Sequence, residues 1–247
     1  MKHNYKLIIS YDGTRYYGWE KQNKTDLTIQ GKIESVLTQM FDEPIAIIGA
    51  GRTDAGVHAR GMVANFTTNT QKNPTYIRDY CNQYLPDDIC IVEVHEASNR
   101  FHSRYNAIGK TYCYTCYTGP LKPVFDKKYV YSLSKTPNVQ LMQQAAKHLI
   151  GTHDFASFCS NTKMKKSTIR TIDRINIDHK GAYITFTYHG NGFLQHMIRI
   201  LTGTLLEIGY GKILPDSIPE IIEAKHRPSA GPTAPACGLC LMEVDYN

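Results

Sequence analysis

The sequence predicts an α+β protein built from two halves with the same order of elements: strand, helix, strand, strand, helix, strand. Three observations lead to this prediction. Apolar residues recur at helical spacing within residues 28–41 and 193–208, and they alternate along residues 182–189, as in a strand. Proline, glycine and asparagine stand where such segments should begin or end. The chain has 247 residues, 42% hydrophobic and 20% charged, which is ordinary for one large or two modest domains.

The first half carries a helix at residues 28–41, whose apolar side chains share one face. These side chains are Ile29, Ile33, Val36, Leu37 and Met40. A second helix is expected to begin after Pro74, because proline is tolerated in a first turn, and to end at the run Leu85-Pro86-Asp87-Asp88. The strands expected in this half are residues 5–11, 45–48, 62–68 and 89–94.

The second half repeats this order. A helix at residues 138–150 is capped by Asn138 and stopped by Gly151, and a long helix at 193–208 is followed by a short one at 216–224. The expected strands are residues 110–118, 168–178, 182–189 and 239–244. Each half is then the split β-α-β-β-α-β unit of ferredoxin-like folds. We expect domains at residues 1–105 and 106–247, with antiparallel sheets and an active-site cleft between them.

Composition excludes several classes of protein. The longest apolar stretch, residues 193–208, is interrupted by polar side chains and is too short to span a membrane. The segment Leu7-Ile8-Ile9 is too short for a signal peptide, so we expect a cytoplasmic protein. A net charge of +6 and 17 tyrosines are compatible with nucleic acid, because cations neutralise phosphates and aromatic rings stack on bases.

The cysteines do not predict a disulfide framework or a metal site. There are seven, an odd number, in a chain large enough to fold without cross-links. Cys113 and Cys116 form one Cys-x-x-Cys pair and Cys237 and Cys240 another, but the two pairs lie much further apart than the 15 to 20 residues of a zinc ribbon. Positions three apart in a strand also point to opposite faces. We expect reduced thiols and no metal.

The most unusual segment is the glycine-rich loop at residues 49–61, Gly-Ala-Gly-Arg-Thr-Asp-Ala-Gly-Val-His-Ala-Arg-Gly. It joins two strands expected to pair as a hairpin, for which two to five residues would suffice. A dinucleotide fingerprint would need glycine where Asp54 stands. A phosphate-binding loop ending at Gly109-Lys110-Thr111 would need glycine where Arg104 stands. Neither interpretation fits.

Asp54 is the remaining candidate for chemistry in this loop. If the Arg52 guanidinium lay within about 4 to 6 Å, it would lower the pKa of the Asp54 carboxyl and keep it ionised. An ionised carboxylate can act as a nucleophile or base. Alternatively, Asp54 caps a turn and Arg52 pairs with it. From the residues alone, both interpretations stand.

The segment Gly51-Arg52-Thr53-Asp54-Ala55-Gly56-Val57-His58 resembles the signature of the TruA family of tRNA pseudouridine synthases. The resemblance extends over nearly the whole chain. The other matching motifs, in order, are Tyr11-Asp12-Gly13-Thr14, Tyr17-Gly18-Trp19, Arg100-Phe101-His102, Gly109-Lys110-Thr111-Tyr112, Gly151-Thr152-His153-Asp154-Phe155, Gly192-Phe193-Leu194, His196-Met197-Ile198-Arg199, Ala230-Gly231-Pro232-Thr233-Ala234-Pro235 and Gly238-Leu239. Met62, Asn65 and Gly31 stand where the family more often has Gln, His and Glu.

The resemblance implies a function and four catalytic residues. Asp54 would be the essential aspartate, Arg52 its loop partner, Tyr112 the aromatic residue that packs on the base, and Arg199 a cation paired with the aspartate. The substrate would be uridine on the 3′ side of the tRNA anticodon stem-loop, at tRNA positions 38–40. A homodimer without any cofactor is also implied, since this isomerisation needs no redox partner or group donor.

Other side chains are expected to hold the tRNA. His58, Arg60, Arg100 and His102 are candidates for phosphate or ribose contacts, although a single histidine is more often a hydrogen-bonded loop residue. A basic run, Lys163, Lys165 and Lys166, continues toward Arg170 and Arg174, and it would either contact phosphates or be a solvated surface. Arg199 lies opposite the apolar stripe of its helix, a position that solvent usually covers.

Two competing functions follow from the same residues. A non-catalytic tRNA-binding protein of this fold would bind tRNA without forming product. A glycoside-cleaving enzyme would usually need two facing carboxylates, and the loop offers only Asp54. The sequence does not say which tRNAs are modified, or whether the aspartate attacks C6 or C1′ of the nucleotide or removes a sugar proton.

Overall fold

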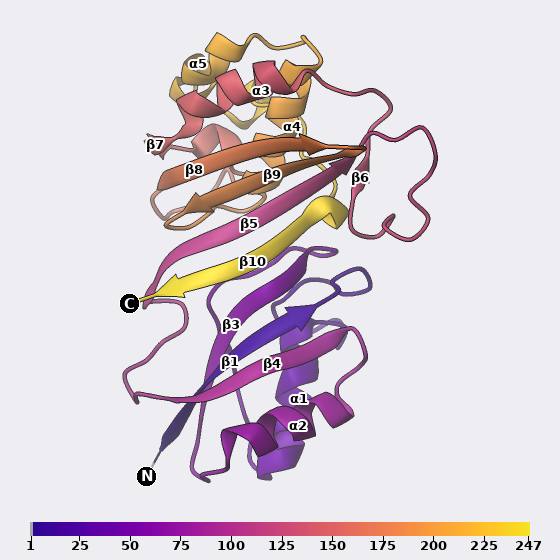
Figure 1. Cartoon of the computed structure of the whole chain (residues 1–247). Coiled ribbons are helices and arrows are strands. Elements are labelled where there is room, and N and C mark those ends of the chain that lie inside the picture. Colours follow the sequence, from indigo (N-terminus) through magenta and orange to yellow (C-terminus); the bar gives the residue numbers. More distant parts are fainter. Residues whose placement is uncertain (1) are drawn as a thin grey trace. The chain divides into compact units, whose positions relative to one another are not determined.

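A computed structural model describes residues 2–247 (Figure 1). The chain forms two compact units, and each contains helices and strands. Unit 1 comprises the chain up to Ile108 together with Cys240–Asn247, and unit 2 comprises Gly109–Leu239. Within residues 2–247, no helix combines the length and the apolar character needed to cross a bilayer.

The sheet of unit 1 has the strand order expected for a split β-α-β-β-α-β unit. Its strands are β1 (His3–Tyr11), β2 (Ile48–Gly49), β3 (His58–Thr68), β4 (Ile89–Ala97) and β10 (Leu239–Tyr246). Strand β1 lies between β4 and β3 and pairs antiparallel with both. The other edge of β3 is shared, because β2 pairs with Ala64 and Asn65 while β10 runs parallel beside His58 and Ala59.

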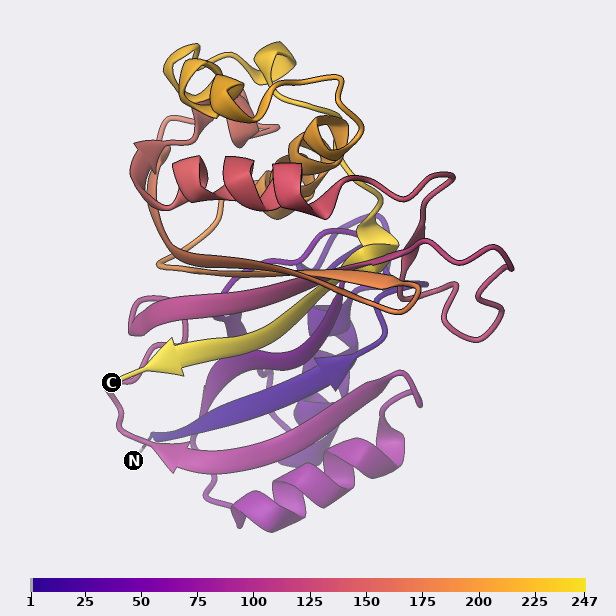
Figure 2. The same cartoon turned by 45° about the horizontal axis from the view of Figure 1, so that its top comes forward.

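Two helices, α1 (Ile29–Phe41) and α2 (Pro74–Tyr84), cover one face of this sheet (Figures 1 and 2). Thr28 caps α1 by accepting a hydrogen bond from the Gly31 N–H, and Asn73 caps α2 with Pro74 in the first turn. The predicted apolar stripe of α1 is buried. The two helices of unit 1 therefore confirm what the apolar spacing and the capping residues predicted.

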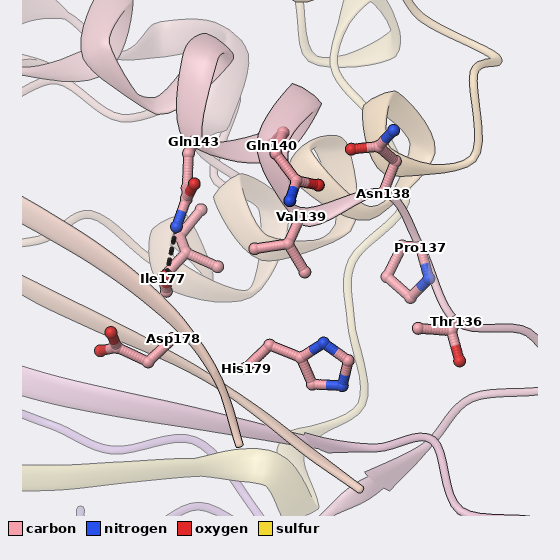
Figure 3. Close-up of a pocket in the computed structure, with 9 residues that line it drawn as sticks. All are labelled: Thr136, Pro137, Asn138, Val139, Gln140, Gln143, Ile177, Asp178 and His179. Carbon is pink, nitrogen blue, oxygen red and sulfur yellow. Dashed lines mark hydrogen bonds between the residues drawn. The ribbon is translucent and has the colours of Figure 1, made fainter. Parts of the chain in front are cut away.

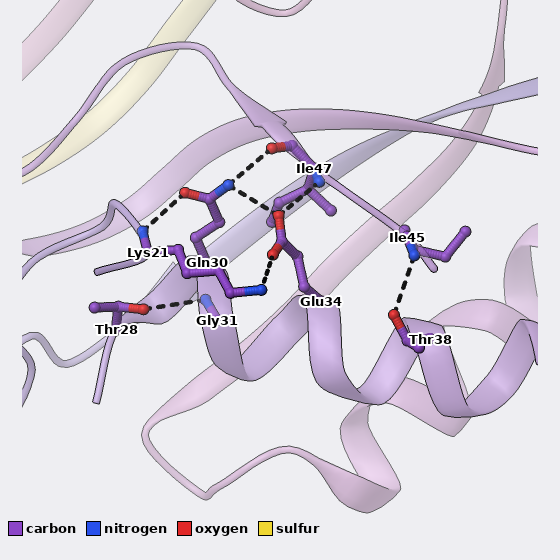
Figure 4. Close-up of polar contacts among 8 residues, drawn as sticks. All are labelled: Lys21, Thr28, Gln30, Gly31, Glu34, Thr38, Ile45 and Ile47. Carbon is purple, nitrogen blue, oxygen red and sulfur yellow. Dashed lines mark hydrogen bonds and ion pairs between the residues drawn. The ribbon is translucent and has the colours of Figure 1, made fainter. Parts of the chain in front are cut away.

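A buried carboxylate on α1 fixes the strand that leads to the glycine-rich loop (Figure 4). Glu34 is 6% exposed, and its Oε1 accepts the Ile47 N–H at 3.0 Å. Gln30 donates from Nε2 to the same carboxylate at 2.9 Å and to the Ile47 carbonyl at 3.2 Å. Lys21 completes the network with its ammonium 3.3 Å from Glu34 Oε2. Helix α1 thus holds the chain immediately before β2.

Replacing Glu34 with alanine should lower the free energy of unfolding by about 1 to 3 kcal/mol, because the Ile47 N–H would lose its acceptor inside the protein. Glu34→Gln keeps an acceptor oxygen and loses only the pair with the exposed Lys21, so it should cost less than about 1 kcal/mol. Urea denaturation would measure both. Equal losses from the two variants would contradict this account of Glu34.

Unit 2 has an antiparallel sheet with the order β5-β9-β8-β7, and β6 runs parallel beside β5. The strands are β5 (Ala107–Tyr117), β6 (Tyr131–Ser132), β7 (Gly151–Asp154), β8 (Ile169–Lys180) and β9 (Tyr183–Gly190). The helices are α3 (Val139–Ala146), α4 (Met197–Gly209) and α5 (Ile218–Glu223). Single 3₁₀ turns occur at Lys147–Leu149, Ala156–Phe158, Pro215–Ser217, Arg227–Ser229 and Ala236–Gly238. The three α-helices lie on one side of the sheet (Figure 2).

The structure differs from the sequence prediction at several elements, and β2 covers Ile48–Gly49 where a strand at residues 45–48 was expected. Strand β3 begins at His58 rather than at residue 62, because His58 and Ala59 pair with β10. Helix α4 begins at Met197, since His196 has φ = 61° and cannot continue a helix. Strands β6 and β7 were not predicted. The last strand was expected in the second half, whereas residues 240–247 group with unit 1 through β3.

Candidate active site

The loop that carries Asp54 runs from Ala50 to Val57, between β2 and β3 of unit 1. Its start is fixed by the Ala50 N–H, which donates to the Val63 carbonyl at 2.7 Å. Its end is a tight turn in which the Val57 N–H donates to the Asp54 carbonyl at 3.1 Å. Gly56 has φ = 78° in this turn, a conformation that favours glycine.

The end of β1 and the segment that follows it, residues 11–19, fix this loop through a set of contacts here called the clamp. Tyr11 and Thr53 share a buried hydrogen bond between their hydroxyls at 2.7 Å, and the Trp19 N–H donates to the Thr53 carbonyl at 3.1 Å. A Cβ at Gly13 would lie 2.0 Å from the Val57 carbonyl oxygen. A Cβ at Gly18, where φ is 98°, would lie 2.7 Å from the Thr53 carbonyl oxygen. Asp54 is half-buried, and the backbone is held on both sides of it, at Thr53 and at Val57.

Arg52 makes an ion pair with a residue that the sequence did not single out. Its guanidinium lies 2.8 Å from Glu20 Oε2, and both side chains are more than half exposed. An exposed pair of this kind contributes little to stability. The role of Arg52 as partner of Asp54 stays a prediction.

His58 is built into the protein rather than presented at its surface. It is 5% exposed, its Nδ1 accepts the Gly13 N–H at 3.1 Å, and the same atom lies 3.2 Å from Asp12 Oδ1. This geometry favours a role in fixing the loop over direct contact with substrate. Arg60, two residues further along β3, is exposed.

The segment Arg100–Asn106 folds around His102. The His102 Nδ1 accepts the backbone N–H groups of Arg104 and Tyr105 at 3.2 Å each, and its ring stacks on Tyr105. Asn65 joins this segment to β3, because its Oδ1 accepts the Ser103 N–H at 2.9 Å. Arg100 is exposed. His102 therefore shapes the turn, and its predicted contact with substrate stays untested.

Tyr112 lies on β5 in unit 2 and is 8% exposed. Its ring meets Phe193 edge to face, with centroids 5.4 Å apart. Phe193 belongs to the segment that enters α4, the helix of Arg199. Tyr112 thus packs against the segment that leads into the helix of Arg199. Both residues belong to unit 2, whereas Asp54 belongs to unit 1.

Arg199 is held by a segment that lies across α4, residues 230–235. The Arg199 Nε donates to the Ala234 carbonyl at 2.8 Å, and the Ala234 N–H donates to the Arg199 carbonyl at 3.0 Å. A Cβ at Gly203 would lie 1.8 Å from the Pro232 carbonyl oxygen, so the segment touches the bare helix backbone. Arg227 braces it further by donating to the Gly231 carbonyl at 2.9 Å.

Nearly all of α4 is buried, so the apolar surface of this helix is wider than the single stripe that the sequence indicated, whereas Arg199 itself is half-buried. The segment that holds Arg199 could be noticed in the sequence, because residues 230–235 contain one glycine and two prolines. In the structure this segment forms no helix or strand. Its partner helix could not be deduced from spacing.

The lysines of the basic run are exposed on the loop between Ser160 and Thr168, as a surface that contacts phosphates would require. Arg170 differs from them. Its Nη1 donates to the backbone carbonyls of Ser167 and Ile169, and burial lowers the pKa of its guanidinium. The predicted tRNA contacts of Lys163, Lys165 and Lys166 stay a prediction.

Within residues 2–247, no three His, Cys, Asp or Glu side chains come together as ligands of a metal ion. Burial raises the pKa of the Cys116 and Cys237 thiols and so disfavours the thiolates that zinc requires. A hollow of about 610 Å³ lies between α3 and β8 (Figure 3). The Gln143 side chain reaches across the hollow and donates to the Ile177 carbonyl. None of the residues that line the hollow is a predicted site residue.

Comparison with known proteins identifies the class to which this fold and carboxylate loop belong. The model of a family described as tRNA pseudouridine synthase matches residues 7–106 and 145–247. The protein is thus an isomerase that acts on tRNA. A tRNA pseudouridine synthase A 1 from Clostridium tetani is 48% identical over 243 residues, covering 98% of this chain and 99% of the relative. The chain belongs to the TruA family of tRNA pseudouridine synthases.

Other relatives agree. A tRNA pseudouridine synthase A 2 from Bacillus cereus is 43% identical over 244 residues, covering 99% of this chain and all of the relative. Among solved structures, a chain from a crystal structure of a Cbf5-Nop10-Gar1 complex aligns with 96% of this chain and 57% of its own length. Its sequence identity is 10% and the TM-score is 0.35, which supports no functional conclusion.

Proposed function

We propose that this chain converts uridine to pseudouridine on the 3′ side of the tRNA anticodon stem-loop, at tRNA positions 38–40, through the carboxylate of Asp54. The observation that carries the proposal is the clamp on the Asp54 loop. Tyr11, Gly13 and Gly18 hold the backbone on both sides of this one half-buried carboxylate. A reacting group held in this way loses little conformational entropy when substrate binds.

The chemistry explains why one carboxylate is enough. The N1–C1′ bond breaks, the base turns, and C5 is joined to C1′, while the proton on C5 is transferred to N1. The carboxylate can add to C6, attack C1′ or remove a sugar proton, and each route balances without an oxidant, metal or group donor. Each route also requires that the uridine leave its stack and enter a pocket.

Tyr112 and Arg199 are the proposed partners of Asp54. Tyr112, packed edge to face on Phe193, is proposed as the aromatic wall for the flipped base. Arg199, oriented through its Nε by Ala234, is proposed as the cation that keeps the aspartate ionised. We further propose that the enzyme works in the cytoplasm as a homodimer and needs no cofactor.

The test is to incubate the protein with an unmodified tRNA transcript and to map pseudouridine at single-nucleotide resolution. The expected product lies within the anticodon stem-loop, on its 3′ side. Modification confined to another arm would overturn the substrate assignment. Binding without any product would favour the alternative, a non-catalytic tRNA-binding protein.

A further inference from the structure

The segment joining β5 to β6 in unit 2, residues 118–130, exposes apolar and basic side chains together. It extends beyond the end of β5 (Figures 1 and 2). Phe125 is 94% exposed, Leu121 77% and Val124 63%, although large apolar side chains usually avoid water. Lys122 and Lys127 are exposed among them. This segment, here called the 118–130 loop, lies between the two stretches matched by the family model.

The loop is held in a defined shape despite its exposure. A Cβ at Gly119 would lie 2.2 Å from the Tyr117 hydroxyl, so the chain turns directly over that ring. The Tyr117 ring meets Tyr183 at 5.2 Å between centroids, and the Tyr183 hydroxyl donates to Asp126 Oδ2 at 2.6 Å. Asp126, the acidic residue of the loop, is therefore turned back to the sheet, and Phe125 beside it faces solvent.

We propose that the 118–130 loop is a tRNA contact surface, in which Phe125 stacks on an unpaired base and Lys122 and Lys127 bind phosphates. An exposed aromatic ring among cations is the arrangement that single-stranded nucleic acid favours. A second copy of this chain fits less well. If a two-fold axis passed through the loop, the same patch would meet itself, and these lysines would approach their own copies without a facing acid.

The loop would bind a part of the tRNA other than the reacting uridine. Tyr112 and Tyr117 lie on the same strand, and five residues of strand span about 16 Å. Phe125 follows the far end of this strand, so we expect it to contact a different part of the tRNA from the base at Tyr112. The loop should affect binding of the tRNA and leave the chemical step unchanged. The inference rests on tRNA as substrate but not on the catalytic roles proposed for Asp54, Tyr112 or Arg199.

The experiment measures binding of a labelled full-length tRNA transcript at several salt concentrations. Phe125→Ala should weaken binding about tenfold, whereas Phe125→Tyr should bind like the unsubstituted protein, because a ring that can stack is kept. The double variant Lys122→Ala/Lys127→Ala should reduce the slope of log affinity against log salt by about 1.4 to 1.8. Leu214→Ala and Lys147→Ala, at exposed positions elsewhere in unit 2, are the matched controls.

Kinetics and oligomeric state complete the test. Phe125→Ala should raise KM and leave kcat unchanged. Unaltered binding by Phe125→Ala and by the double variant would overturn the proposal, and so would conversion of a dimer to monomers by Phe125→Ala in sedimentation equilibrium. If the unsubstituted protein makes no pseudouridine while Phe125→Ala still weakens binding, the proposed function fails and this inference stands.

Discussion

Replacing Asp54 with asparagine is expected to lower pseudouridine formation by on the order of a thousandfold or more, because the amide cannot act as a carboxylate nucleophile or base. The change is nearly isosteric. The clamp on the loop uses the backbone and side chain of Thr53 and the backbone of Val57, which the substitution leaves in place. The variant should therefore fold normally and bind tRNA. Product yield under single-turnover conditions, with tRNA affinity measured in parallel, is the appropriate readout.

Asp87→Asn is the matched control for this experiment. Asp87 is an exposed carboxylate in the same unit, so its variant changes the net charge equally and should retain full activity. Substantial activity in Asp54→Asn would refute the proposed role of the aspartate. Loss of folding in Asp54→Asn, seen by circular dichroism, would instead give Asp54 a structural role.

Replacing Gly203 with alanine is expected to disturb both stability and activity. Alanine is intrinsically favoured over glycine in a helix by up to about 1 kcal/mol, so propensity alone predicts stabilisation. The new methyl group would lie 1.8 Å from the Pro232 carbonyl oxygen, a backbone atom that cannot rotate away. Either α4 or the segment at residues 230–235 must move. Overpacking of this kind costs about 1 to 3 kcal/mol, so the net effect should be destabilising.

Activity should fall at least about tenfold, because the segment displaced by Gly203→Ala also orients Arg199 through Ala234. Urea denaturation and product formation, both at a temperature where the variant is folded, would separate the two effects. Glu207→Ala is the control on the same helix, since it removes only an outer pair with Lys212. Unchanged stability in Gly203→Ala would show that the segment adapts without strain.

The elements of unit 1 were predictable because local signals agree with tertiary packing. Thr28 and Asn73 cap the helices, Pro74 opens the second, and the stripe beginning at Ile29 faces the sheet. Strand β7 was missed because its four residues carry no alternation that could be recognised. The start of β3 was misplaced because its pairing partner lies far along the chain, and no local pattern reports such a contact.

The candidate site was predictable at the level of motifs but not of contacts. Gly13 and Gly18 stood out as motif residues. Only the folded structure shows that the absence of a side chain at these two positions lets the backbone of Thr53 and Val57 approach them. Pairing of Arg52 with Glu20, 32 residues away, leaves no mark in the sequence. His58 could be a ligand or a support from sequence alone, and its burial against Gly13 favours support.

The pairing of β10 with β3 has a consequence for the folding of the protein during its synthesis on the ribosome. His58 follows the Asp54 loop directly, but its partner Cys240 is synthesised only after all of unit 2. At 5 to 20 residues per second, the sheet edge next to the loop waits on the order of ten seconds or more for its last strand. During that interval the nascent chain carries an unpaired strand edge beside its future carboxylate. Synthesis of the second unit thus precedes completion of the first.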